Sequence, residues 1–195
     1  NPTLVSRETV SFEELIPEIC KTVPGPISVE VTSMKAEEMV KQGESFVEFG
    51  SNIVVKLPVS VDGLKACRLL DQSGIPVNVT LVFSTNQALL SAKVGASFVS
   101  PFIGRLDDIG HTGMDVVKQT LQCFKNYSFK TQVLVGSIRH PLHVLEAACL
   151  GAQVSTMPYS VMKQLFNHPL TDLGLDKFLN DWKNYKTGTS NNLKL

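Results

Sequence analysis

Short apolar segments alternate along the chain with longer segments in which apolar residues recur at helical spacing. This alternation predicts an α/β protein with parallel strands joined by right-handed helical crossovers. The predicted strands are Ile27–Thr32, Ile53–Leu57, Val77–Phe83, Phe98–Ser100, Gln132–Ser137 and Val154–Met157. The predicted helices between them are Lys35–Gly43, Val61–Ser73, Thr85–Val94, Gly113–Asn126 and His140–Leu150.

The C-terminal part of the chain continues the helical pattern. Residues 158–185 contain further helix, which ends in Asp172–Trp182. The polar segment Lys186–Leu195 contains Gly, Ser and two Asn residues, and we expect it to be a flexible tail. Since no linker composition interrupts the chain, we expect residues 1–195 to form a single domain.

Two architectures agree with this pattern, an open doubly wound sheet and a closed (β/α)8 TIM barrel. A dinucleotide-binding open sheet would carry a GxGxxG segment after its first strand, and the sequence has none there. Side chains alternate across a strand, so Glu30 shares a face with Ser28 and Thr32. In the next strand, Lys56 lies on the face opposite Val55. Polar residues gathered on one face favour the barrel, because they would point to its axis.

Composition narrows the possible partners. Eighteen basic residues balance eighteen acidic ones, which gives no indication of a nucleic-acid or membrane-surface partner. The apolar runs are too short to cross a bilayer, and the N-terminus lacks a secretory signal pattern. Neither histidines nor cysteines have metal-site spacing, so we expect no metal and a reducing compartment, the cytoplasm. We expect the four cysteines to be small core residues: Cys20, Cys67, Cys123 and Cys149.

Lys56 interrupts the apolar run Ile-Val-Val-Lys-Leu-Pro, where a lysine is uncommon unless it is paired or has a chemical task. Desolvation favours an uncharged amine, and an uncharged amine can attack a ketone to form a Schiff base. The later steps need a group that moves protons, and Glu30 on the preceding strand is a suitable carboxylate. The alternative is an ion pair in which Lys56 and Glu30 only neutralise each other.

Three residues indicate where an anionic part of a substrate would bind. Arg105 and Arg139 offer planar guanidinium groups that suit phosphate oxygens. Ser137 and Arg139 lie near the start of a predicted helix, and helix N-termini attract phosphate. The late strands of (β/α)8 barrels often form such a site. The alternative is that both arginines are solvated loop residues that pair with Asp107 or Asp108.

Three long segments carry a family resemblance: NIVVKLPVS, VNVTLVFSTNQALLSAKVGASFVSPFIGRLDDIG and SIRHPLHVLEAACLGA. They resemble the transaldolases, specifically the small bacterial and archaeal subfamily that also contains fructose 6-phosphate aldolase. The likeness extends from Asn1 to about Trp182 without an obvious gap. It implies a (β/α)8 TIM barrel, Schiff-base chemistry on sugar phosphates with no cofactor, and a homo-oligomer, either a pentamer or a decamer.

The resemblance also implies roles for individual residues. Lys56 matches the Schiff-base lysine, and Glu30 and Thr80 match the carboxylate and the threonine that work with a catalytic water. Asn78 matches the residue that holds the dihydroxyacetone unit. Glu30, Asn78 and Phe102 favour a transaldolase, since the aldolase branch usually has glutamine and tyrosine in place of the first and last. The substrate-binding residues implied in the same way are Asn1, Asn78, Ser100, Phe102, Arg105, Ser137 and Arg139, of which the last three match the phosphate-binding set.

The resemblance therefore predicts a transaldolase of the pentose phosphate pathway. Such an enzyme moves a dihydroxyacetone unit from sedoheptulose 7-phosphate to glyceraldehyde 3-phosphate, which gives erythrose 4-phosphate and fructose 6-phosphate. The alternatives are a fructose 6-phosphate aldolase and a catalytically dead remnant with a scaffolding role.

One departure from the family concerns its first strand, first helix and most of its second strand, which carry a catalytic aspartate. These elements have no counterpart in this sequence, so it predicts six strands where a closed barrel has eight. On this basis, we expect the chain alone to be poorly active or inactive.

Overall fold

The structure is a computed structural model, and it describes residues 1–6 and 9–187. Contacts divide the chain into two compact units, residues 1–157 and the residues from 158 onward. Each unit is described by itself, and the single domain expected from the sequence stays a prediction.

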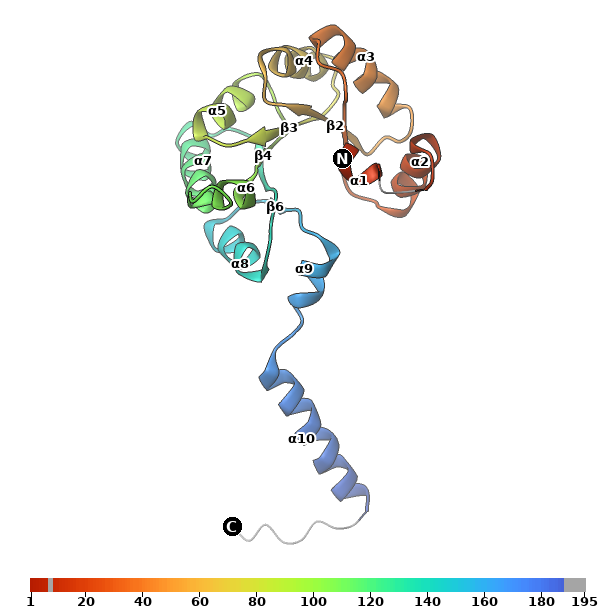
Figure 1. Ribbon diagram of the computed structural model, residues 1–195, viewed down its shortest axis with the longest axis vertical. Helices are drawn as coiled ribbons and strands as arrows, with labels where there is room; N and C mark the ends of the chain where they lie inside the picture. Colours follow the sequence, from red (N-terminus) through yellow and green to blue (C-terminus); the bar gives the residue numbers. More distant parts are fainter. Residues whose placement is uncertain (7–8, 188–195) are drawn as a thin grey trace. The chain divides into compact units, whose positions relative to one another are not determined.

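Six parallel strands form one sheet in the first unit, in chain order from β1 to β6. The sheet curls, and helices cover its outer side (Figure 1). This arrangement is an open portion of a (β/α)8 barrel and confirms the predicted fold class. The strands are β1 (Ile27–Glu30), β2 (Ile53–Pro58), β3 (Val77–Val82), β4 (Phe98–Pro101), β5 (Gln132–Val135) and β6 (Val154–Ser155). The helices are α1 (Pro2–Val5), α2 (Phe12–Thr22), α3 (Ala36–Val47), α4 (Val61–Gln72), α5 (Thr85–Lys93), α6 (Ile103–Asp107), α7 (Gly113–Tyr127) and α8 (Pro141–Leu150).

The predicted strands and helices of this unit are all present, although several of their ends differ. β1 ends at Glu30, two residues before the predicted end. The N–H of Val31 still donates to the Lys56 carbonyl oxygen, whereas the N–H groups of Thr32 and Ser33 donate to Gln42 Oε1 on α3, over 2.9 and 3.2 Å. β5 and β6 likewise end two residues early, at Val135 and Ser155. β2 and β4 instead end one residue later than predicted, at Pro58 and Pro101.

Helices α1, α2 and α6 were not predicted. α2 begins after Ser11, whose side chain accepts a hydrogen bond of 3.3 Å from the N–H of Glu14. This Ser-x-x-Glu arrangement is a sequence signal for a helix start. Pro17 inside the same helix obscures that signal, since proline removes a backbone donor and usually interrupts a helix.

The two faces of the sheet differ as the alternating pattern predicts. Val55 and Val79 are completely buried. A Cβ atom on Gly43 of α3 would lie 2.9 Å from Cγ1 of Val55, so α3 approaches the apolar face of β2 very closely. Lys56 and Asn78 alternate with these valines and therefore point to the inner side of the curve.

β3 contains a local irregularity beside Thr80. Its register with β4 shifts between Val79 and Val82, and Leu81 adopts a left-handed backbone with a φ of 59°. Bulky residues rarely take this conformation, and a bulge of this kind redirects the side chains next to it. Backbone strain therefore lies directly beside a predicted catalytic residue, which is where proteins often keep it.

The cysteines are all unpaired thiols, but they do not share one environment. Cys67 is buried, and burial, with a smaller effect of the Asp71 carboxylate, raises the pKa of its thiol to about 12. Cys149 is exposed, so the expectation that all four cysteines are core residues is wrong. No helix in the described residues is both long enough and apolar enough to span a membrane.

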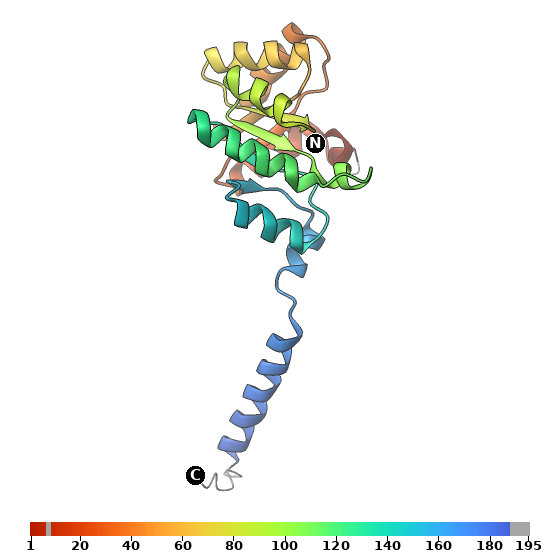
Figure 2. The same cartoon turned by 90° about the vertical axis from the view of Figure 1, so that its left-hand side faces the viewer.

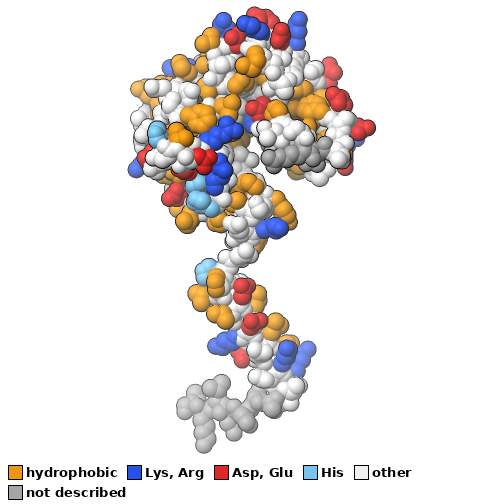
Figure 3. Space-filling model, viewed as in Figure 1, with side chains coloured by type: hydrophobic (Ala, Val, Ile, Leu, Met, Phe, Trp, Pro, Cys, Tyr) orange, Lys and Arg blue, Asp and Glu red, His pale blue; other side chains and the backbone are white. Residues whose placement is uncertain are grey.

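The second unit contains α9 (Tyr159–Gln164) and α10 (Pro169–Lys186). α10 extends the predicted helix Asp172–Trp182 at both ends, and none of its residues is buried. By helical spacing, large apolar side chains share one side of it, which we name the apolar face of α10: Leu175, Phe178, Leu179, Trp182 and Tyr185. Hydrophobic side chains are visible along this helix in Figure 3. Lys186, the first residue of the predicted tail, ends α10, and residues 188–195 of that tail lie outside the described residues.

Candidate active site

Glu30, Lys56 and Asn78 lie in one row across three neighbouring strands. The register pairs Glu30 of β1 with Lys56 of β2, and Lys56 with Asn78 of β3. Paired residues of parallel strands present their side chains to the same face, so all three point to the inner side of the curve. The row includes the last residue of β1, and barrels of this type carry out their chemistry at the carboxyl ends of their strands.

Lys56 and Glu30 form a largely buried ion pair. Lys56 Nζ lies 3.0 Å from Glu30 Oε2, and each side chain is 13% exposed. The same oxygen accepts a hydrogen bond of 3.1 Å from Asn1 Nδ2, so the N-terminus lies at the carboxyl end of β1 (Figure 2). The ion pair alone would also agree with the charge-neutralising alternative. The residues around the pair therefore bear on which of the two interpretations applies.

Phe102 lies close to two cations. It follows β4, and its ring centroid is 5.9 Å from Lys56 Nζ and 5.3 Å from Arg105 Cζ. The ring also packs edge-on against Phe83, with 6.2 Å between the centroids. Gly136 leaves room for the ring, because a Cβ atom there would lie 3.0 Å from two ring carbons. The aromatic ring attracts both positive charges, and it relates the amine to one of the predicted phosphate-binding arginines.

A buried chain of hydrogen bonds holds Asn78. Its amide donates to Ser28 Oγ over 3.0 Å and accepts from Ser100 Oγ over 2.7 Å. Asn78 is 1% exposed and Ser100 is fully buried, so these bonds fix the orientation of the amide. Ser28 was not among the predicted site residues, although it shares the polar face of β1 with Glu30.

Thr80 is fully buried two residues beyond Asn78. Its hydroxyl oxygen has no hydrogen-bond partner among the residues that the structure describes. A buried hydroxyl is normally satisfied by protein, water or ligand, and this one is therefore available to hold a water or a substrate group.

The predicted phosphate-binding residues lie on two adjacent segments. Arg105 is exposed on α6, whereas Ser137 and Arg139 lie between β5 and α8. The N–H of Gly104 donates to the Ser137 carbonyl oxygen over 3.2 Å and joins the two segments. Arg139 Nη2 donates to Asp108 Oδ2 over 2.8 Å, which is one of the pairs expected for a solvated loop.

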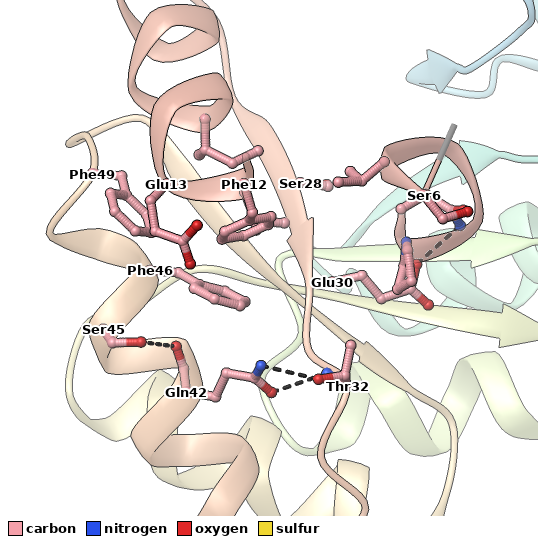
Figure 4. Close-up of a pocket in the computed structure, with 15 residues that line it drawn as sticks. Ser6, Phe12, Glu13, Ser28, Glu30, Thr32, Gln42, Ser45, Phe46 and Phe49 are labelled. Carbon is pink, nitrogen blue, oxygen red and sulfur yellow. Dashed lines mark hydrogen bonds between the residues drawn. The ribbon is translucent and has the colours of Figure 1, made fainter. Parts of the chain in front are cut away.

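A cavity of about 510 Å³ borders β1 and includes Glu30 in its wall. Figure 4 shows Phe12 and Phe46 on one side, with 5.2 Å between their ring centroids. It also shows Gln42, whose Nε2 donates to Thr32 Oγ1 over 3.1 Å. Gln42 was not predicted, because nothing in the local pattern relates it to the strand. Glu30 therefore lies between this cavity and Lys56.

Within residues 1–6 and 9–187, no group of three or more His, Cys, Asp or Glu side chains is arranged to hold a metal ion. The groups near Lys56 are a carboxylate, an amide and hydroxyls. Such groups suit nucleophilic catalysis by an amine combined with proton transfer.

The fold resembles solved structures of two flavoenzymes. A flavocytochrome b2 variant with pyruvate bound has a TM-score of 0.59 and 18% identity, and the match covers 76% of this chain and 46% of that one. A mandelate oxidase variant with a monooxide FMN adduct has a TM-score of 0.54 and 17% identity, with 77% and 52% covered. The chain spans about half the length of these proteins, and at such identity the likeness concerns the fold alone.

Comparisons of the sequence find relatives of much higher identity. A chain from Petrotoga mobilis named "Probable transaldolase" is 55% identical over 186 residues, which are 95% of this chain and 84% of that protein. Proteins with the same name in Aquifex aeolicus and Methanococcus maripaludis are 54% and 51% identical over 183 residues. These matches cover 94% of this chain in both cases, and 84% and 85% of the relatives. The profile of the Transaldolase/Fructose-6-phosphate aldolase family matches residues 7–190. The resemblance seen in the sequence is thus confirmed, and the chain belongs to the transaldolase/fructose-6-phosphate aldolase family.

Proposed function

We propose that the protein is a transaldolase that carries a dihydroxyacetone unit on Lys56 between sugar phosphates. The observation that carries the proposal is the contact of 3.0 Å between Lys56 and Glu30, on adjacent strands at the inner side of a curled sheet. The contact brings an amine and a carboxylate together in a chain whose relatives are named probable transaldolases, and this supports the proposal. The roles given to the other residues belong to the same proposal.

The first step joins the sugar to the enzyme. Glu30 takes a proton from the Lys56 ammonium, and the amine lone pair attacks the ketone carbon of the donor sugar. The resulting hydroxyl takes a proton back from Glu30 and leaves as water, which gives an iminium. Phe102 favours the positive charge of this iminium through its ring face, 5.9 Å from the nitrogen.

The second step cleaves a carbon–carbon bond. Glu30 removes the proton of the hydroxyl on the carbon beyond the bond to be broken, directly or through a water held by the Thr80 hydroxyl. The bonding electrons move toward the iminium and form an enamine, and the first aldose leaves as an aldehyde. Asn78 holds the dihydroxyacetone unit, since Ser28 and Ser100 fix its amide.

The third step reverses this chemistry with another aldehyde. The enamine carbon attacks the carbonyl carbon of the acceptor, whose oxygen takes the proton from Glu30. Water then adds to the iminium and releases the new ketose and the Lys56 amine. Arg105, Ser137 and Arg139 bind the sugar phosphate group, and Asn1 belongs to the substrate-binding set.

Two alternatives remain to be separated from this proposal. Fructose 6-phosphate aldolase would release free dihydroxyacetone without an acceptor. Glu30 and Phe102 stand where that branch usually has glutamine and tyrosine, and this favours the transaldolase. A catalytically dead scaffold would need no functional pair at Lys56.

The setting of the reaction is part of the proposal. We place the enzyme in the pentose phosphate pathway of the cytoplasm, acting on sedoheptulose 7-phosphate and fructose 6-phosphate. We also propose a homo-oligomer, a pentamer or a decamer. The apolar face of α10 supports an assembly, because exposed apolar side chains of that size usually pack against another surface.

Borohydride trapping tests the proposal. The protein is incubated with fructose 6-phosphate and reduced, and the added mass is located by peptide mass spectrometry. We expect a three-carbon adduct on Lys56, none in Lys56→Met, and an unchanged adduct in Lys65→Met, which replaces an exposed lysine. Acceptor dependence of dihydroxyacetone release then separates transferase from aldolase.

A chain without an adduct is measured again after extension by the N-terminal strand and helix typical of the family. Absence of the adduct in both forms would exclude the Schiff-base function of Lys56.

A further inference from the structure

His143 lies in the first turn of α8, close to the residues proposed to bind phosphate. Its Nδ1 accepts a hydrogen bond of 3.2 Å from the backbone N–H of Arg139. Its Nε2 lies 3.2 Å from Asp107 Oδ2, and the side chain is 10% exposed. The imidazole therefore bridges the segment before α8 and the end of α6. Figure 3 shows basic, acidic and histidine side chains gathered where these helices meet.

Asp107 also makes a hydrogen bond with the backbone of α7. Its Oδ1 accepts a hydrogen bond of 2.8 Å from the N–H of Gly113, the first residue of α7. Asp107 ends α6, the short helix that carries Arg105. His143 and Asp107 together thus connect the segment of Arg105, the start of α7 and the segment of Arg139.

The contacts define the proton positions on the imidazole. Since the Arg139 N–H donates to Nδ1, the proton of the neutral ring is on Nε2 and points to Asp107. Burial lowers the pKa of His143, which favours this neutral form at neutral pH. The charged groups that face it are His140 and Arg139, which lower the pKa further, and Asp107 and Glu146, which raise it.

The backbone on either side of this bridge is under constraint. Ser137 has a left-handed backbone with a φ of 60°, which surrounding contacts must maintain. A Cβ atom on Gly104 would overlap the Ser137 carbonyl oxygen and the Arg139 side chain. The α6 backbone is thus pressed against the segment of Ser137 and Arg139, and a small shift of either would change the spacing of the two arginines.

The side-chain ion pair of Arg139 does not fix this segment by itself. Arg139 and Asp108 are 51% and 58% exposed, and solvent-exposed pairs of this kind hold their geometry weakly. The partly buried hydrogen bond from the Arg139 backbone to His143 is the stronger restraint.

We propose that His143 is a positioning residue for the substrate phosphate. By accepting a hydrogen bond from the Arg139 N–H and contacting Asp107, it keeps Arg105 and Arg139 at a distance from each other at which both bind one phosphate group. It does not touch the substrate. This inference rests on the proposed function, and it adds to that function a residue which sets affinity for the phosphorylated end.

Two substitutions separate the two contacts of the ring. In His143→Asn the amide oxygen lies where Nδ1 lies and keeps an acceptor for Arg139. In His143→Gln the amide nitrogen lies where Nε2 lies and keeps a donor for Asp107. His143→Ala removes both. Sulfate binding by calorimetry reports on the phosphate site, and borohydride trapping of dihydroxyacetone, which has no phosphate, reports separately on Lys56.

We expect His143→Ala to weaken sulfate binding and to raise the KM for fructose 6-phosphate by about tenfold, with kcat and dihydroxyacetone trapping unchanged. His143→Asn should restore both values to within about twofold of the original protein, and His143→Gln should not. This pattern separates positioning from a general loss of structure.

Several results would overturn the inference. They are an unchanged sulfate affinity in His143→Ala, equal losses of sulfate binding and trapping in all three variants, and rescue by Gln rather than Asn. Absence of sulfate binding in the original protein would overturn it as well. Failure of trapping in the original protein with sulfate binding intact would instead count against the proposed function.

Discussion

Glu30 Oε2 lies 3.0 Å from Lys56 Nζ, and the two residues are partners in the register of β1 and β2. Because parallel strands keep this register along their length, the contact is set by the backbone of the sheet. An acid and an amine are therefore held together before any substrate arrives. This arrangement makes the chemistry at Lys56 testable residue by residue.

The role of Glu30 in proton transfer predicts a split between binding and turnover. Glu30→Gln keeps an oxygen that can accept from Lys56 but loses the carboxylate that moves protons. We expect fructose 6-phosphate to bind still, while the Lys56 adduct forms more slowly and kcat falls by about 10²- to 10⁴-fold. Glu13→Gln, which changes another wall residue of the same cavity, should leave kcat unaltered. Equal kcat in the Glu30 variant and the original protein would refute the assignment.

Phe102 faces both Lys56 and Arg105, so its ring should contribute to substrate affinity. Phe102→Leu keeps an apolar side chain and removes the aromatic face. We expect the loss of two cation–π contacts of about 0.5–1 kcal/mol each, seen as a several-fold rise in KM. Phe129→Leu removes a similar contact with Lys93, at 5.4 Å, and serves as the control. Steady-state kinetics in which both variants match the original protein would contradict this prediction.

Gly104 predicts a steric effect on stability. Gly104→Ala would place a methyl group against the Ser137 carbonyl oxygen and the Arg139 side chain. We expect the free energy of unfolding to fall by about 1–3 kcal/mol, as for other overpacked sites. Gly25→Ala adds the same methyl group where no atom lies within 4 Å and should be nearly neutral. Urea titration of both variants measures the difference, and equal midpoints would show that the contact relaxes freely.

His143 makes stability depend on pH. Burial lowers the pKa of His143 in the folded state. In the unfolded chain the pKa of a histidine is about 6.5. As the pH falls, the unfolded chain therefore binds the proton first. Its contribution to the free energy of unfolding is present above about 6.5 and is lost as the pH falls through the folded-state pKa.

Denaturant titrations at a series of pH values test this dependence. His143→Asn should flatten the loss of stability on acidification, because asparagine does not titrate. His111→Asn, at an exposed position in the same unit, should follow the original protein. Curves for the original protein and His143→Asn that run parallel at every pH would assign the acid sensitivity to other groups.

The apolar face of α10 predicts a change in assembly state. Replacing Phe178 and Trp182 together by Glu should convert the proposed oligomer to smaller species, because charges there oppose burial of the face. Lys177→Glu changes the charge on the opposite side of the same helix and should leave the mass unchanged. Native mass spectrometry provides the measurement. An oligomer that survives the double substitution would place the interface elsewhere.

The sequence was informative where one residue breaks a regular pattern. Lys56 interrupts an apolar strand, and the alternation within Ser28-Val29-Glu30 places a carboxylate on the matching face. Both facts are local, and the parallel register brings them together. The alternation of strands and helices agrees with both an open sheet and a barrel, and the polar residues on one face of the strands favour the barrel.

The features that were not predicted depend on contacts between residues far apart in the sequence. Asn78 bonds to Ser28, 50 positions away in the chain, and His143 reaches Asp107 on another helix. No periodic pattern relates these pairs. α2 was missed for a local reason, since Pro17 obscured its capping signal.

Trp182 is the chain's single tryptophan, and it lies 55% exposed on α10, stacked on Tyr185 at 5.5 Å between the ring centroids. Its fluorescence therefore reports on the surroundings of this helix. If the apolar face of α10 becomes buried between copies, the emission shifts to shorter wavelength as protein concentration rises. Circular dichroism follows the folding of the sheet and its helices, so the molecule offers separate optical signals for assembly and for folding.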